Sequence, residues 1–164
     1  IKLGGSILAH VSTAVTSEEF SYVVSLFIYI SCCNCFCDGC HSPYLSKDIG
    51  EVLSLERLQG LIESNKGITL VGFMGGDSDP KEINKLAKWV RENYPELHIG
   101  WYSGKQELAD SVIDIDNFDY VKLGPYIKQF GPLNNPNTNQ KFYKIDRNAH
   151  IMIWCTNIFW KEAE

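Results

Sequence analysis

The sequence predicts an α/β fold, either a partial (βα) barrel or a mostly parallel sheet, that closes with a C-terminal β-hairpin. Strand-like and helix-like segments alternate through residue 123, which is the pattern of parallel strands joined by crossover helices. Glycine-bearing loops follow the strand-like segments, and two last strand-like segments enclose a polar turn. With 164 residues, 45% of them hydrophobic, the chain is long enough to bury one core.

The first two elements are expected on either side of a cysteine-rich loop. Residues 22–31 are rich in Val, Ile, Phe and Tyr and carry no charge, Pro or Gly, which predicts a buried strand. Ser54 is a suitable N-cap for a helix that ends at Gly67. The apolar face of this helix consists of Leu55, Leu58, Leu61 and Ile62.

The alternation continues to residue 123. Residues 68–73 predict a second buried strand, and Asp79-Pro80 predicts the start of a second helix with Glu82 in its capping position. A third strand is expected at residues 97–101, a short helix at 105–112 and a fourth strand at 119–123. The C-terminal hairpin is expected from residues 141–145 and 150–154 around Asp146-Arg147-Asn148, after a Pro/Asn-rich loop at 130–140.

Composition limits the classes of function. The formal net charge of −5 argues against non-specific nucleic-acid binding. The longest apolar run, residues 22–33, is shorter than the about 20 residues that span a bilayer. We therefore expect a cytoplasmic protein that binds neither nucleic acid nor membrane. The domain organisation that we predict is an N-terminal arm of open role at residues 1–20 and a single domain at 21–164.

Sulfur is concentrated in one loop. The stretch ISCCNCFCDGCHSPYL holds five of the six cysteines within nine positions, Cys32 to Cys40. In a cytoplasmic protein, such spacing indicates a metal site rather than a disulfide framework. The pattern Cys33-x3-Cys37-x2-Cys40 would give an iron–sulfur cube three cysteine ligands, whereas such a cube normally takes four. One iron would then stay open for another ligand. Zinc is the alternative, although no second pair of ligands follows.

These residues resemble a known family. The three-cysteine pattern followed by His41-Ser42-Pro43 resembles the cluster loop of radical S-adenosylmethionine (SAM) enzymes. The stretches CDGCHSPYL, GFMGGDSDP and KLGPYIKQFGPLNNPNTNQKFY together resemble the family of anaerobic ribonucleoside-triphosphate reductase activating proteins. The resemblance covers residues 22–145.

The resemblance implies a cofactor site. Cys33, Cys37 and Cys40 would bind a [4Fe-4S] cluster, and the open iron would take the amino and carboxylate groups of SAM. Gly39 and His41 would lie against SAM. Gly75, Gly76 and Asp77 match the glycine-glycine-acid motif that receives the amino group of SAM, and Ser103 is a candidate contact for the ribose. Cys32 and Cys35 fall outside the family's ligand pattern. Asp79 is the alternative to Asp77, but it is better placed as a helix cap.

The resemblance also implies a reaction and its partners. A family member cleaves SAM reductively and produces a glycyl radical in the large subunit of an anaerobic ribonucleotide reductase, with flavodoxin or ferredoxin as the one-electron donor. No side chain is expected to act as a catalytic acid or base. Two other functions stay open at this point. One is another small radical SAM enzyme, similar to deazaguanine synthases, and the other is a zinc-binding interaction module without catalysis.

Overall fold

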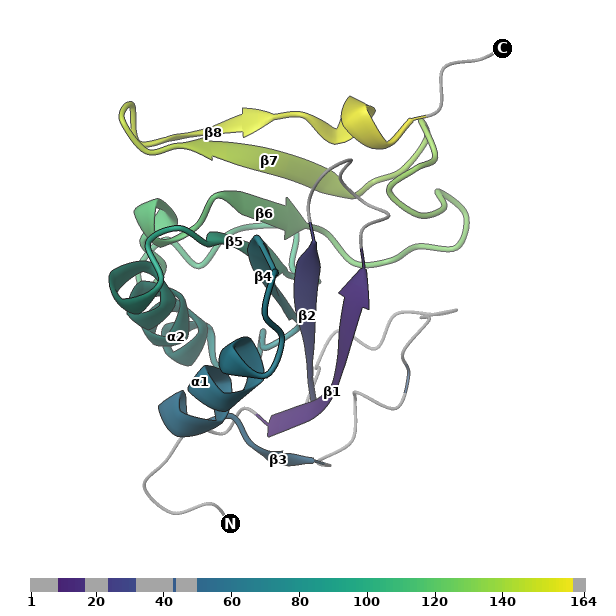
Figure 1. Ribbon diagram of the computed structural model, residues 1–164. Helices are drawn as coiled ribbons and strands as arrows, with labels where there is room; N and C mark the ends of the chain where they lie inside the picture. Colours follow the sequence, from purple (N-terminus) through teal and green to yellow (C-terminus); the bar gives the residue numbers. More distant parts are fainter. Residues whose placement is uncertain (1–8, 17–23, 32–42, 44–49, 161–164) are drawn as a thin grey trace.

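One mixed sheet organises the described part of the chain (Figure 1). The computed structural model describes residues 9–16, 24–31, 43 and 50–160. The strands there follow the order β3-β1-β2-β4-β5-β6-β7-β8. Their bounds are β1 Ala9–Thr16, β2 Ser25–Ile30, β3 Glu51–Val52, β4 Leu70–Met74, β5 His98–Tyr102, β6 Tyr120–Leu123, β7 Lys141–Asp146 and β8 Ile151–Trp154.

The centre of the sheet is parallel, and its flanks are antiparallel. Strands β2, β4, β5 and β6 run in the same direction, with Gly72 of β4 opposite Gly100 of β5. Strand β1 joins β2 antiparallel, and β7 and β8 form an antiparallel hairpin beside β6. The predicted α/β fold with a C-terminal hairpin is confirmed. Its parallel centre brings the ends of four strands to one edge, where ligand sites of such sheets lie.

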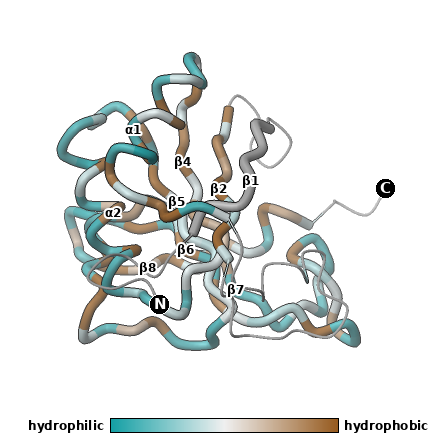
Figure 2. The backbone as a smooth tube through the Cα atoms, turned by 90° about the horizontal axis from the view of Figure 1, so that it is seen from below, coloured by the Kyte–Doolittle hydropathy of each residue, from teal (hydrophilic) through white to brown (hydrophobic). Residues whose placement is uncertain are grey.

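Two helices cover the same face of the parallel strands (Figure 1). Helix α1 (Leu55–Glu63) begins after the cap Ser54, whose hydroxyl accepts from the Arg57 amide, as the sequence predicts. Helix α2 (Pro80–Asn93) turns four apolar residues towards the sheet. Together with alternate strand residues they form the buried core, and the tube in Figure 2 is accordingly hydrophobic along β2 and β4. The core contributions of α2 are Ile83, Leu86, Ala87 and Val90.

The other face of the sheet is lined with aromatic rings. Phe142 of β7 contacts the rings of Tyr102, Tyr120 and Phe159, and Tyr102 also contacts Phe27 of β2. Phe159 belongs to the short 3-10 helix η3 (Thr156–Phe159) that follows β8. The short helix η3 therefore packs onto this face through Phe159.

The helix expected at residues 105–112 is wrong. The segment forms turns, and a single 3-10 helix, η2 (Ile115–Asn117), follows it. The carbonyl of Lys105 accepts from the Gly124 amide at 2.7 Å, so it is engaged with the end of β6. Ala109 instead accepts from the amides of Val112 and Ile113 in a tight turn. An eight-residue segment is too short to form a helix against such tertiary contacts.

The N-terminal arm contributes to the sheet. Strand β1 lies between β2 and the two-residue strand β3, and neither strand was expected from the sequence. The division into residues 1–20 and 21–164 stays a prediction.

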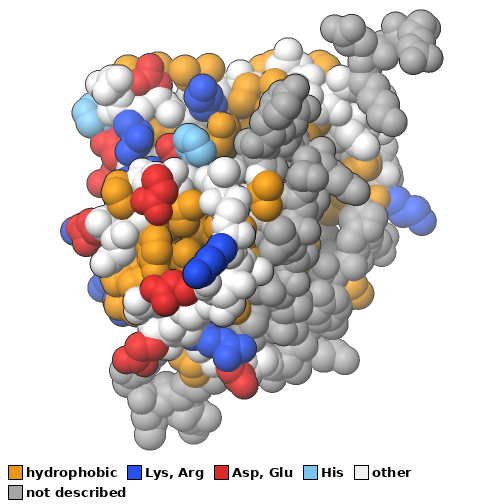
Figure 3. All heavy atoms as spheres, viewed as in Figure 1, with side chains coloured by type: hydrophobic (Ala, Val, Ile, Leu, Met, Phe, Trp, Pro, Cys, Tyr) orange, Lys and Arg blue, Asp and Glu red, His pale blue; other side chains and the backbone are white. Residues whose placement is uncertain are grey.

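Figure 3 shows hydrophobic side chains among charged ones on the face that carries the helices. No helix within the described ranges has the length and apolar character needed to cross a membrane.

Candidate functional site

The loops after β4 and β5 lie side by side at the carboxyl edge of the sheet. The amide of Gly75 donates to the Tyr102 carbonyl at 3.0 Å, which extends the ladder between these strands. The indole Nε1 of Trp101 donates to the Gly75 carbonyl at 2.7 Å. Four predicted site residues, Gly75, Gly76, Asp77 and Ser103, are thereby brought into one place.

The two glycines allow the chain to turn in close contact with its neighbours. Gly75 has a φ of 96° and Gly76 a φ of 87°, values that side chains rarely tolerate. A Cβ on Gly75 would lie 3.2 Å from the Ile30 carbonyl oxygen, and one on Gly76 would lie 2.5 Å from Ile83 Cδ1. The fold itself therefore requires both glycines, because they let this loop approach β2 and α2.

Asp77 is held by the loop that follows β5. The side chain is buried, with 8% of its surface exposed. The Ser103 hydroxyl donates to Oδ1, and the Gly104 amide donates to Oδ2 at 2.9 Å. Both carboxylate oxygens thus accept hydrogen bonds from a neighbouring strand end, and this fixes the direction of the carboxylate.

Asp79 has a different task. Its Oδ1 accepts from the Glu82 amide at 3.2 Å, which caps α2 as predicted. Of the two carboxylates, Asp77 is the one attached to the strand ends. The geometry favours Asp77 over Asp79 as the carboxylate available to a ligand there.

Two buried polar groups border this edge. The Lys122 ammonium at the end of β6 donates to the Gly124 carbonyl at 2.9 Å and lies 5.8 Å from the centre of the Tyr102 ring. The Ser78 hydroxyl, next to Asp77, is buried and has no hydrogen-bond partner among the described residues. A buried polar atom without a partner often marks the place of a ligand or water. This property fits a site that takes a polar small molecule.

A hollow of about 380 Å³ lies beside the end of β6. Asn139 lines it, and its side-chain amide donates to the Pro125 carbonyl at 3.0 Å. The other lining residues are Gln106, Glu107, Leu123, Gly124 and Lys141. The carboxyl edge is therefore open enough at this point for a small group to approach the strand ends.

The predicted cluster ligands Cys33, Cys37 and Cys40 lie outside the described residues. The same holds for Cys32, Cys35, Gly39, His41 and Tyr44. Within the ranges that the structure describes, no group of three His, Cys, Asp or Glu side chains is arranged to hold a metal ion. Cys155 is a free thiol, half-buried after β8, and burial raises its pKa. A thiol that resists ionisation is a poor metal ligand.

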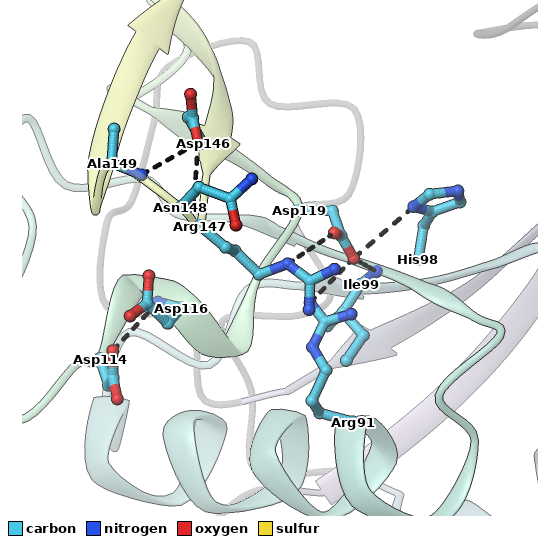
Figure 4. Close-up of polar contacts among 10 residues, drawn as sticks. All are labelled: Arg91, His98, Ile99, Asp114, Asp116, Asp119, Asp146, Arg147, Asn148 and Ala149. Atoms are coloured by element: carbon cyan, nitrogen blue, oxygen red, sulfur yellow. Dashed lines mark hydrogen bonds and ion pairs between the residues drawn. The ribbon is translucent and has the colours of Figure 1, made fainter.

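A second polar cluster lies at the opposite, amino edge of the sheet (Figure 4). Asp119, at the start of β6, accepts from Arg91 Nη2 at 2.9 Å and from the Ile99 amide at 2.8 Å. Arg147 Nε and His98 Nδ1 lie 3.8 Å and 3.7 Å from its carboxylate oxygens. This cluster ties α2, β5 and the hairpin turn to β6. Sequence reasoning missed it because its members are far apart along the chain.

The fold and the strand-end loops define an α/β protein with a candidate ligand site at the carboxyl edge of its parallel strands. A family model described as "4Fe-4S single cluster domain" matches residues 23–122, more than half of the chain. The protein belongs to this family and is an iron–sulfur protein with a [4Fe-4S] cofactor. The match includes the cysteine loop and the loops after β4 and β5. Neither a curated protein nor a solved structure matches the chain.

Proposed function

We propose that this iron–sulfur protein is a radical SAM activating enzyme that generates a glycyl radical in anaerobic ribonucleotide reductase. One observation carries the proposal: the single-cluster family match spans a loop whose pattern Cys33-x3-Cys37-x2-Cys40 offers three thiolates. A cluster held by three cysteines has an iron that is open to a small ligand. A zinc-binding module fits this three-cysteine loop less well, because structural zinc sites are closed by four protein ligands.

The residues at the carboxyl edge fit SAM as that ligand. The carboxylate oxygens of Asp77 are suited to accept from an ammonium group. The buried hydroxyl of Ser78, which follows Asp77 in the sequence, and the ammonium of Lys122 at the end of β6 are further polar groups at this edge. In this proposal Cys33, Cys37 and Cys40 hold the cluster. Gly39, His41, Gly75, Gly76 and Asp77 surround SAM, and Ser103 lies near its ribose.

Held by these residues, the cluster and SAM would supply one-electron chemistry: an electron from the reduced cluster would cleave SAM, and a hydrogen atom would be removed from a glycine Cα. The chain's own residues then act by binding, orientation and exclusion of water. Asp77, Phe27 and Phe142 are all buried, which limits the contact of these side chains with water. Exclusion of water from a site suppresses side reactions of a reactive carbon centre.

The reductase is proposed to dock beside the strand ends. Tyr126 and the loop at residues 130–140 follow β6 at this edge, and Phe130 in that loop is an exposed aromatic residue. The loop has internal bonds: Asn135 Oδ1 accepts from the Asn137 amide at 2.9 Å, and the Thr138 hydroxyl donates to the Gly131 carbonyl at 3.3 Å. A loop that is longer than a mere connection and braced in this way suits a docking surface. Tyr44 is proposed to belong to the same surface.

The test is an anaerobic assay. Protein, SAM, a one-electron reductant such as reduced flavodoxin or ferredoxin, and the reductase are mixed, and the reductase is examined by electron paramagnetic resonance. The proposal expects a glycyl doublet and stoichiometric 5′-deoxyadenosine. Cleavage of SAM without a doublet, where a known activase succeeds, would indicate a radical SAM enzyme with another substrate, such as a deazaguanine-type synthase. No cleavage by cluster-loaded protein would reject the radical SAM assignment.

The docking surface has its own test. Replacing Phe130 with Ala should weaken glycyl-radical formation while leaving SAM cleavage without the reductase unchanged, because the ring lies on the loop rather than at the strand ends. Phe130→Leu, which keeps an apolar side chain, is the matched control. Loss of SAM cleavage in Phe130→Ala would show that the loop serves the SAM site instead.

A further inference from the structure

We propose that Ser103 is a positioning residue that acts through Asp77, holding its carboxylate in the direction needed to receive the amino group of SAM. This inference rests on the proposed function and deepens it, since it assigns a task to a residue of that same site. Ser103 would not need to touch SAM to affect its binding.

The contacts form a continuous chain across three strand ends. The Ser103 amide donates to the Lys122 carbonyl of β6 at 2.9 Å. The Ser103 hydroxyl donates to Asp77 after β4, and it accepts from the Lys105 amide at 3.1 Å. Ser103 is therefore fixed by its backbone and its side chain before it orients Asp77.

The hydroxyl has little capacity left for a ligand. A serine hydroxyl has one hydrogen and two lone pairs. The hydrogen goes to Asp77, and one lone pair accepts from Lys105. Only 1% of the Ser103 surface is exposed, so a ligand finds almost no surface of this residue to contact. These two facts favour an effect through Asp77 over a direct contact with the ribose.

Fixing the carboxylate in advance has a physical benefit. A carboxylate that rotates freely must lose that freedom when an ammonium binds, whereas one held by two donors is already ordered. The Gly104 amide holds the second oxygen at 2.9 Å, so removal of the Ser103 hydroxyl takes away the donor at Oδ1 while this bond at Oδ2 stays. We expect Ser103→Ala to loosen the carboxylate without removing it from the site.

The first test is a double-mutant cycle on SAM binding by cluster-loaded protein, measured by anaerobic equilibrium dialysis with labelled SAM. Ser103→Ala should weaken binding about tenfold, the effect of losing one hydrogen bond to a charged group. In the Asp77→Asn background, the same substitution should change binding by less than about twofold, because residues that act as a unit are not additive. Ser103→Thr, which keeps the hydroxyl, should restore most of the affinity.

The second test does not involve SAM. Amide hydrogen exchange should be faster at Gly104 in Ser103→Ala than in the wild type, because a loosened Asp77 accepts less well from that amide. Thr156→Val is the matched control: it deletes a buried hydroxyl that accepts from the Phe142 amide at 2.9 Å, outside the candidate site. This control should change neither Gly104 exchange nor SAM affinity.

The failures are distinguishable. Equal effects of Ser103→Ala in both Asp77 backgrounds would show that Ser103 contacts SAM itself, and wild-type affinity or unchanged Gly104 exchange in Ser103→Ala would show that it does not position Asp77. Each of these results overturns the inference and leaves the proposed function standing. Cluster-loaded wild-type protein that binds no SAM would overturn the proposed function, and this inference with it.

Discussion

Replacing Asp119 with Ala should destabilise the protein strongly, although the residue lies far from the candidate site. Asp119 is 12% exposed at its side chain, and its partner Arg91 is 16% exposed. The substitution removes the acceptor of both the Arg91 guanidinium and the Ile99 amide (Figure 4). It leaves a largely buried cation and a buried amide without their partner.

The size of the effect follows from these contacts. Breaking a buried ion pair by removing one partner costs about 3–5 kcal/mol of unfolding free energy. Both side chains keep some contact with solvent, so we take the lower end, about 3 kcal/mol. For a domain of this length, each kcal/mol lowers the melting temperature by about 2–4 °C. The expected decrease is therefore roughly 6–12 °C.

The assay is anaerobic thermal unfolding of cluster-loaded protein, followed by circular dichroism. Arg147→Ala is the matched control, because Arg147 Nε lies 3.8 Å from Asp119 Oδ1 and the side chain is 49% exposed. Such an exposed pair contributes less than about 1 kcal/mol, so the melting temperature should change little. A decrease in Asp119→Ala no larger than that of Arg147→Ala would refute the view that the buried Arg91 and Ile99 contacts stabilise this edge.

The remaining predictions concern the site loops. Gly76→Ala should lower the melting temperature, because its φ is 87° and a Cβ would meet Ile83. Gly60→Ala is the control, because Gly60 lies in helix α1 with nothing near an added Cβ. This substitution should raise the free energy of unfolding by about 0.5–1 kcal/mol. Asp79→Ala should cost about 1 kcal/mol as a lost cap and leave SAM affinity nearly unchanged, while Asp77→Ala should weaken SAM binding strongly. The reverse pattern in a SAM-binding assay would exchange their roles. Replacement of Cys33, Cys37 or Cys40 with Ala should abolish SAM cleavage. Variants with Ala at Cys32 or Cys35 should retain the cluster in an iron assay. Loss of iron from Cys35→Ala, together with its retention in Cys33→Ala, would change the assigned ligand pattern.

The elements that the sequence predicts well are those with local signals. The caps Ser54 and Asp79 mark the starts of both helices, and the uncharged run before the cysteine loop marks β2. Strand β1 has no comparable signal: its sequence AHVSTAVT is short of large apolar residues, and its place is set by pairing with β2. The segment at 105–112 has an apolar pattern typical of a helix, but the Lys105 carbonyl accepts from the Gly124 amide after β6. The segment therefore forms no helix.

The candidate site also has features that the local sequence predicts and features that it does not. The glycine-glycine-acid motif identifies Gly75, Gly76 and Asp77 as candidate site residues. The alternation of strands and helices predicts that they lie near Ser103. The hydrogen bonds of Asp77 with Ser103 and Gly104 depend on the register of β4 against β5, which no local pattern encodes. The Asp119 cluster likewise joins residues from separate elements and has no motif.

The most direct test of the central claim is the electron paramagnetic resonance spectrum of the reduced, anaerobically purified protein with and without SAM, together with its metal content. The account predicts about four irons and four sulfides per chain and a cluster signal that changes when SAM is added, since SAM would bind the open iron. Stoichiometric zinc without iron would contradict the assignment of the cluster, and a cluster signal that SAM leaves unchanged would contradict the open coordination site.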